Sequence, residues 1–178
     1  MKILLGDKNR LALECVESYG DPSLGRIYMY VNGNRFGNDD IEFEIDSMIQ
    51  NTLSHFKVYG QSLHGLADCP SVELFDSYVK VSSFDFENDD RERLGEISAL
   101  NYMPGFVEKI VEVDDCVFRY VHYAFDNCLI ILIPMGVKLK LYVRDDNSGF
   151  CTEVVTNEDE FLGLWKEMSR RRGLEEPN

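Results

Sequence analysis

Acidic residues with regular spacing are the first candidates for chemistry in this sequence. The segment 85–96 places carboxylates at the first, third, fifth and twelfth positions, which are ligand positions of a calcium-binding EF-hand loop. Asp90, however, stands where that loop needs glycine for its sharp turn, and Glu92 replaces the usual apolar residue. These departures argue against calcium, and the sequence predicts no bound metal.

Other residue types that commonly take part in catalysis lie far apart in the sequence. The histidines His55, His64 and His122 form neither an HExxH motif nor a close ligand pair, and no two cysteines have CxxC spacing. The nucleophile motif GxSxG and the phosphate-binding motifs GxxxxGKS, GxxxxGKT and GxGxxG are absent. The sequence therefore predicts a non-enzyme without catalytic residues or a cofactor, although a site assembled from distant residues stays open.

Signals for export or membrane insertion are missing as well. Only three apolar residues, Ile3 to Leu5, precede polar sequence at the beginning, whereas a secretory signal needs roughly 7–15. The longest apolar run, 128–133, stops at Pro134, and a spanning helix needs roughly 20 residues. With five widely spaced cysteines, we expect a cytoplasmic protein with reduced thiols.

The charge of the chain is strongly negative and uneven. Its 178 residues include 18 Lys plus Arg against 32 Asp plus Glu, a net charge of -14. Residues 1–38 carry a net +1, residues 39–115 a net -13 and residues 116–178 a net -2. This balance argues against nucleic acid or an anionic membrane as the partner. It leaves a basic partner open, although the charge counts taken alone favour solvated loops over a binding surface.

The elements that must position these residues begin with strands. Alternating apolar residues predict strands at 11–19 and 26–31, with Gly20-Asp21-Pro22 ending the first. The turn signal Asn32-Gly33-Asn34 predicts a hairpin return through Arg35-Phe36. Asp46-Ser47 then precedes apolar residues in steps of three and four, which predicts a capped helix reaching Phe56.

The rest of the chain predicts further strands and a final helix. Strands are expected at 78–81, 117–125, 129–133, 137–143 and 150–155, and a short helix at 89–94. In the strand 137–143, Lys138 and Lys140 occupy the side opposite to the apolar residues. The last helix is predicted to begin at the N-cap Thr156 and to end in Arg170-Arg171-Arg172-Gly173.

The order of these elements favours an α+β fold. Successive strands favour antiparallel pairing over a doubly wound sheet. We therefore expect a single domain over residues 1–178, with a mostly antiparallel sheet, one helix after the N-terminal strands and one C-terminal helix packed on the sheet.

The N-terminal 40 residues resemble a known family. The matching features are Gly6-Asp7, the Leu24-Gly25-Arg26 triplet entering the aromatic strand 27–31, the turn at Gly33, and Gly37 just before acids. With these features the chain resembles immunity proteins of bacterial polymorphic-toxin and contact-dependent growth inhibition systems, in particular immunity family forty-two. The family has no catalytic residues to transfer.

The resemblance implies a cytosolic protein that binds a cognate C-terminal toxin domain and blocks it. Many such toxins are nucleases with a basic nucleic-acid groove, which an acidic surface could cover. We place the interface in the acidic middle block on our own inference. The expected electrostatic contacts are Asp85, Glu87, Asp89 and Asp90, and the expected aromatic anchors are Phe84 and Phe86.

Two other classes of function stay open at this point. A small cytosolic enzyme with a composite hydrolase-type site would show a concave pocket with convergent polar groups. An acidic regulatory module or nucleic-acid mimic would compete with DNA or RNA for its partner's groove. The sequence predicts neither the oligomeric state nor the activity of the toxin.

Overall fold

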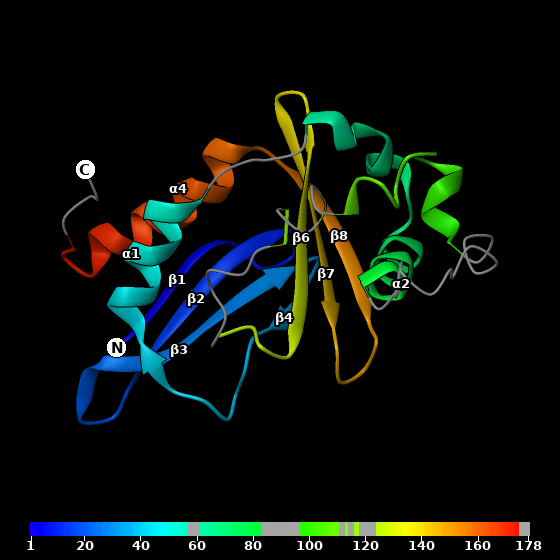
Figure 1. The fold of residues 1–178 in the computed structure, drawn as a ribbon. Coiled ribbons are helices and arrows are strands. Elements are labelled where there is room, and N and C mark those ends of the chain that lie inside the picture. Colours follow the sequence, from blue (N-terminus) through cyan, green and yellow to red (C-terminus); the bar gives the residue numbers. More distant parts are fainter. Residues whose placement is uncertain (57–60, 83–96, 111–112, 114–115, 118–123, 175–178) are drawn as a thin grey trace.

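The fold is described by a computed structural model over residues 1–56, 61–82, 97–110, 113, 116–117 and 124–174 (Figure 1). Two antiparallel sheets and the helices that cover them make up this part of the chain. Within these ranges no helix has the length and apolar character needed to cross a membrane. The predicted α+β class with antiparallel sheets is confirmed.

The N-terminal sheet, sheet A, has the strand order β1-β2-β3-β4, and β5 pairs with the beginning of β3. The tight β3–β4 turn has positive φ at Asn32 (49°) and Gly33 (83°), as the asparagine-glycine signal predicts. The expected break at Gly20-Asp21-Pro22 is shorter than predicted, because β3 already begins at Asp21. The strands are β1 (Lys2–Asp7), β2 (Leu11–Ser18), β3 (Asp21–Val31), β4 (Asn34–Phe36) and β5 (Phe43–Glu44).

Helices α1 (Ile45–His55) and α4 (Glu158–Arg171) lie together on the inner face of sheet A (Figure 1). Both helices are predicted, but both caps are one or two residues away from the expected positions. Glu44 occupies the N-cap of α1, in place of Asp46-Ser47. The Asn157 side chain, rather than Thr156, caps α4 by accepting a hydrogen bond from the Glu160 amide at 2.8 Å.

The second sheet, sheet B, consists of β6 (Cys128–Met135), β7 (Lys138–Asp145) and β8 (Cys151–Thr156) in that order. Its two faces belong to different apolar clusters. Ile130 packs in the cluster shared with sheet A, whereas the adjacent Ile131 packs in a second cluster on the other face. Burial on both faces explains why β6 is a continuous apolar run instead of an alternating one.

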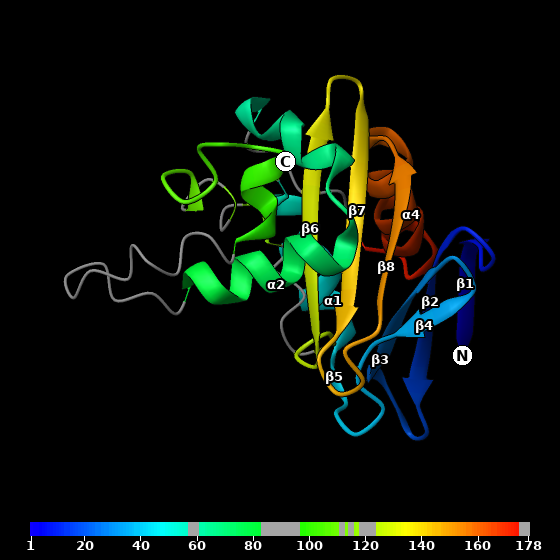
Figure 2. The same cartoon turned by 90° about the vertical axis from the view of Figure 1, so that its right-hand side faces the viewer.

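The second cluster is covered by helices that follow α1. They are the 3-10 helix η1 (Gln61–Asp68), α2 (Ser71–Ser82) and the 3-10 helix η4 (Ser98–Asn101). Figure 2 shows α2 in front of sheet B. The predicted short strand at Tyr78–Val81 is wrong, because these residues form the end of α2. The β-forming residues Tyr78 and Val81 are buried at helical spacing with Leu74 and Phe75.

The remaining predicted elements have mixed outcomes. The strands predicted at 129–133, 137–143 and 150–155 correspond to β6, β7 and β8. Of the strand predicted at 117–125, Val117 forms an isolated bridge with Ile131, and residues 118–123 lie outside the described part. The helix predicted at 89–94 also lies outside it. A single domain over residues 1–178 stays a prediction.

Candidate binding surface

The predicted contact residues follow directly after helix α2. Its last residue is Ser82, and the segment 83–96 lies outside the described residues. This segment contains all six predicted contacts, as well as the carboxylates with EF-hand-like spacing. The six are Phe84, Asp85, Phe86, Glu87, Asp89 and Asp90. The described helices that flank this segment in the sequence are α2 before it and η4 after it.

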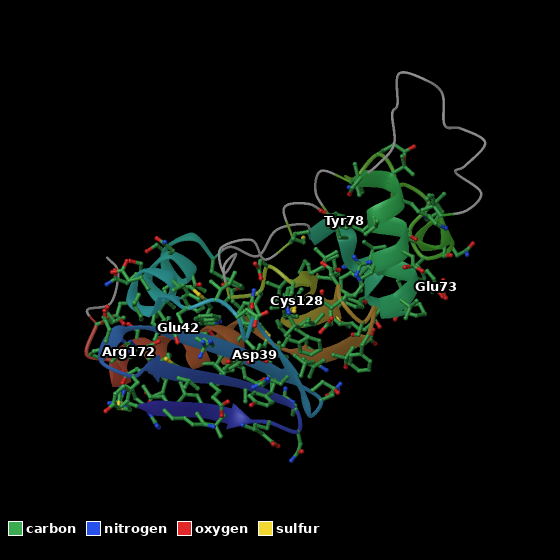
Figure 3. The ribbon with its side chains drawn as sticks, turned by 90° about the horizontal axis from the view of Figure 1, so that it is seen from below. Asp39, Glu42, Glu73, Tyr78, Cys128 and Arg172 are labelled. Atoms are coloured by element: carbon green, nitrogen blue, oxygen red, sulfur yellow. The ribbon has the colours of Figure 1, made fainter. Side chains whose placement is uncertain are left out.

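Of the five acids in the first group of the middle block, residues 39–46, three form ion pairs within the protein. Tyr28 donates a hydrogen bond from its hydroxyl to Asp39 at 2.8 Å, and Ser47 donates to Glu44 at 2.8 Å. Figure 3 shows Asp39 and Glu42 beside sheet A and Arg172 near the end of α4. The ion pairs are Arg35 with Asp39 at 2.6 Å, Arg26 with Glu42 at 3.1 Å, and Arg172 with Asp46.

Most cations in the described part of the chain are held in such pairs. Besides those three arginines, the paired cations are Lys2, Lys8, Arg10, Lys140, Arg144, Arg170 and Arg171. By contrast, Asp68 and Asp76 form no ion pair with any described residue. The unbalanced negative charge of the described part therefore includes the region of η1 and α2.

The outward face of α2 combines this charge with exposed apolar residues. Val72 is 54% exposed and Val79 is 44% exposed, and the exposed Asp76 stands between them. Spacings of four and three residues place the three side chains on one face of a helix. Within the described part of the chain, Asp76 forms no ion pair. The face is therefore an apolar stripe with a negative centre.

Sequence reasoning missed this face because it interpreted Tyr78–Val81 as a strand. The signal was nevertheless present. Leu74, Phe75, Tyr78 and Val81 recur at helical spacing after Pro70, and they predict a buried face. Once that face is assigned, the outward positions follow from the helical period.

The outer face of sheet A also carries charged and aromatic residues, but they satisfy one another. Glu14 is 3% exposed and accepts hydrogen bonds from Lys8 at 2.8 Å and from the Tyr30 hydroxyl at 2.9 Å; Lys2 pairs with it at 2.9 Å. Burial alone would raise the pKa of Glu14, yet these donors lower it to about 2. The Lys8 ammonium also lies 4.0 Å from the centre of the Tyr30 ring. This face is a closed polar network.

A buried lysine and tyrosine on sheet B are the strongest described candidates for a composite catalytic site. Lys140 donates to the Ala67 carbonyl at 2.7 Å and pairs with Glu153 at 2.8 Å. The Tyr142 hydroxyl donates to the Leu66 carbonyl at 2.8 Å, and burial raises the pKa of Tyr142. Both side chains therefore fasten the end of η1 to sheet B, and this role commits their protons to backbone carbonyls.

Three cysteines in the described part are poor nucleophiles. Burial raises the pKa of Cys15 to about 11 and the pKa of Cys69 and Cys128 to about 12. These thiols stay protonated at neutral pH, whereas a nucleophilic cysteine reacts as the thiolate. Within the described ranges no three His, Cys, Asp or Glu residues are grouped closely enough to hold a metal ion.

Two comparisons with known proteins, one of folds and one of sequence families, find a match. The crystal structure of CdiI from Burkholderia dolosa AUO158 has a similar fold, with a TM-score of 0.51 and 13% sequence identity over 95% of this chain and 99% of that one. No curated protein matches the sequence. The family model for immunity protein 42, Imm42, matches residues 1–171.

This match covers nearly the whole chain and defines its class: an immunity protein, which binds and neutralises a toxin. More narrowly, the chain belongs to the immunity protein 42 family. The resemblance seen in the first 40 residues is thereby confirmed and extends through helix α4.

Proposed function

We propose that this immunity protein neutralises a basic nuclease toxin domain of a contact-dependent inhibition system by covering its active-site region with an acidic surface. One observation carries the proposal: residues 39–115 hold a net charge of -13 within a total of -14. Most described cations outside that block are paired internally, so they offer little attraction to phosphate. A nuclease groove is basic because it binds phosphates, and it therefore complements such a surface.

The proposed action is binding in the cytoplasm, without catalysis. The reactive groups of the described part have structural tasks, since Lys140 and Tyr142 hold η1. The segment with Asp85, Glu87 and Asp89 supplies carboxylates that would occupy the places of nucleic-acid phosphates. The neighbouring aromatic residues, Phe84 and Phe86, would bury apolar area and slow dissociation.

An inhibition assay tests the nature of the toxin. The toxin domain encoded beside this chain's gene is purified and mixed with increasing amounts of the immunity protein, and cleavage of DNA and RNA is followed. We expect cleavage to stop at one immunity protein per toxin domain. The dissociation constant, measured by calorimetry, should rise with salt because the attraction is electrostatic. A toxin without cleavage activity, or an affinity independent of salt, contradicts the proposal.

A second experiment tests the proposed contact segment. The double variant Asp85→Lys/Asp89→Lys should associate with the toxin roughly tenfold more slowly at low salt. The control Asp40→Lys/Glu158→Lys changes the net charge equally at exposed acids elsewhere, and it should associate at nearly the wild-type rate. Equal association rates for the two double variants would exclude segment 84–90 as the contact.

A further inference from the structure

We infer that the outward face of helix α2, formed by Val72, Asp76 and Val79, docks against the basic surface of the toxin domain. The inference rests on the proposed function and names the described part of the same interface. The face leads along the chain into segment 84–90, since α2 ends at Ser82. The occupant is a protein surface with a cation flanked by apolar side chains.

The helix is a firm support for such a contact. Leu74 and Phe75 are fully buried beneath it against the second apolar cluster. The Ser77 hydroxyl accepts a hydrogen bond from the Ala99 amide at 3.0 Å, which ties α2 to η4. The Phe75 ring meets the Tyr142 ring edge-on, with 6.4 Å between centroids. A helix fixed on its inner face presents its outward side chains without a large loss of entropy on binding.

The negative charge of the α2 face indicates which kind of partner binds there. Asp76 lacks an ion pair with any described cation, whereas Asp39 and Glu42 are both paired with arginines. Asp68, which precedes α2, also lacks one among the described residues. The region therefore attracts a cation and repels phosphate, which excludes nucleic acid and anionic membranes as occupants.

The exposed valines point to a protein as the source of that cation. Val72 and Val79 lie one turn on either side of Asp76, so a docked surface would shield the carboxylate from water. A carboxylate–cation pair inside an apolar rim is a typical energetic centre of a protein interface. Val137 is more exposed, at 91%, but it lies in the β6–β7 turn without this helical arrangement.

Binding kinetics of surface variants test the inference. Asp76→Lys should associate with the toxin domain roughly tenfold more slowly, and the milder Asp76→Asn should give a smaller change in the same direction. Val72→Ser/Val79→Ser should dissociate roughly tenfold faster because apolar contact is lost. All three positions are exposed, so the variants should keep the wild-type circular dichroism and urea midpoint. The controls are Asp40→Lys for charge and Val137→Ser for apolar exposure.

The outcomes separate this inference from the proposed function. If the wild type inhibits the nuclease and the three α2 variants bind with wild-type rates, the docking face is wrong and the proposed function stands. If the wild type neither binds nor inhibits a nuclease toxin, both the α2 docking face and the proposed function are wrong. Slow association of Asp76→Lys with normal association of Asp40→Lys supports the α2 face.

Discussion

Arg172 donates a hydrogen bond from Nη1 to Oε1 of Glu17 at 2.7 Å, although the two residues lie 155 positions apart in the chain. The same guanidinium donates to the carboxylate of Asp46 at the beginning of α1 and to the Pro22 carbonyl at 2.9 Å. Its side chain is 6% exposed. One arginine at the end of α4 therefore joins the last helix to sheet A and to α1.

Removing this arginine should destabilise the fold. In Arg172→Ala, the buried carboxylate of Glu17 and the partly exposed carboxylate of Asp46 lose a partner, and the free energy of unfolding should fall by about 3 kcal/mol. Urea unfolding followed by circular dichroism measures the change. The matched control is Arg171→Ala, whose pair with Glu167 is exposed and should contribute less than about 1 kcal/mol. Equal losses in the two variants would contradict the joining role of Arg172.

The Glu14 network should make the protein sensitive to acid. The pKa of Glu14 in the folded protein is lowered from 4.5 to about 2, so its contribution to stability is complete above pH ~4.5. That contribution, about 3 kcal/mol, is lost as the pH falls toward 2. Glu14→Gln should therefore be less stable than the wild type at pH 7, and the difference should shrink between pH ~4.5 and ~2. Asp40→Asn, an exposed control, should show no such convergence.

Two glycines should respond to alanine in opposite directions. A Cβ atom on Gly25 would collide with the Val16 carbonyl oxygen and lie 2.7 Å from Cδ1 of Ile45, so Gly25→Ala should cost about 3 kcal/mol. Gly163 lies inside α4 with no atom near its missing side chain, and Gly163→Ala should stabilise the protein by about 1 kcal/mol. Thermal unfolding of both variants measures the contrast. A stable Gly25→Ala protein would show that β2, β3 and α1 do not need this close approach.

The buried hydroxyl of Tyr142 should contribute to the stability of the fold. Tyr142→Phe leaves the ring in place but removes the donor to the Leu66 carbonyl, and it should cost about 1–2 kcal/mol. Tyr19→Phe removes a hydroxyl from a fully exposed ring and should change stability by less than about 0.5 kcal/mol. Urea midpoints of the two variants test the difference. Neutralisation of the toxin should persist in Tyr142→Phe at temperatures where the variant is folded.

Local signals predict much of this fold because they act over a few residues. The Asn32-Gly33 turn depends on backbone conformations that this pair adopts readily. The basic end of α4 before Gly173 likewise follows from the helix dipole and from the positive φ of that glycine. The sequence patterns above do not predict strand β1, although Ile3 and Leu5 alternate in it.

Long-range packing could not be predicted in the same way. The strand pattern predicts Lys140 on the side opposite to the apolar residues of β7, but η1 covers that side, and the lysine is only 9% exposed. The acids at 39–46 look like a free surface in sequence, but three of them form ion pairs, one with the distant Arg172. The six predicted contacts lie in segment 83–96, outside the described residues, and stay a prediction.

The position of sheet B between two apolar clusters determines how its backbone amides exchange with solvent. Strand β7 is hydrogen-bonded on both sides, and both of its faces are covered. Its amide protons should therefore exchange with deuterated solvent only when the whole described fold opens. A packing defect in either apolar cluster would then raise the exchange rate throughout β7. Destabilising one cluster should therefore weaken the whole described fold, and with it the surface that binds the toxin.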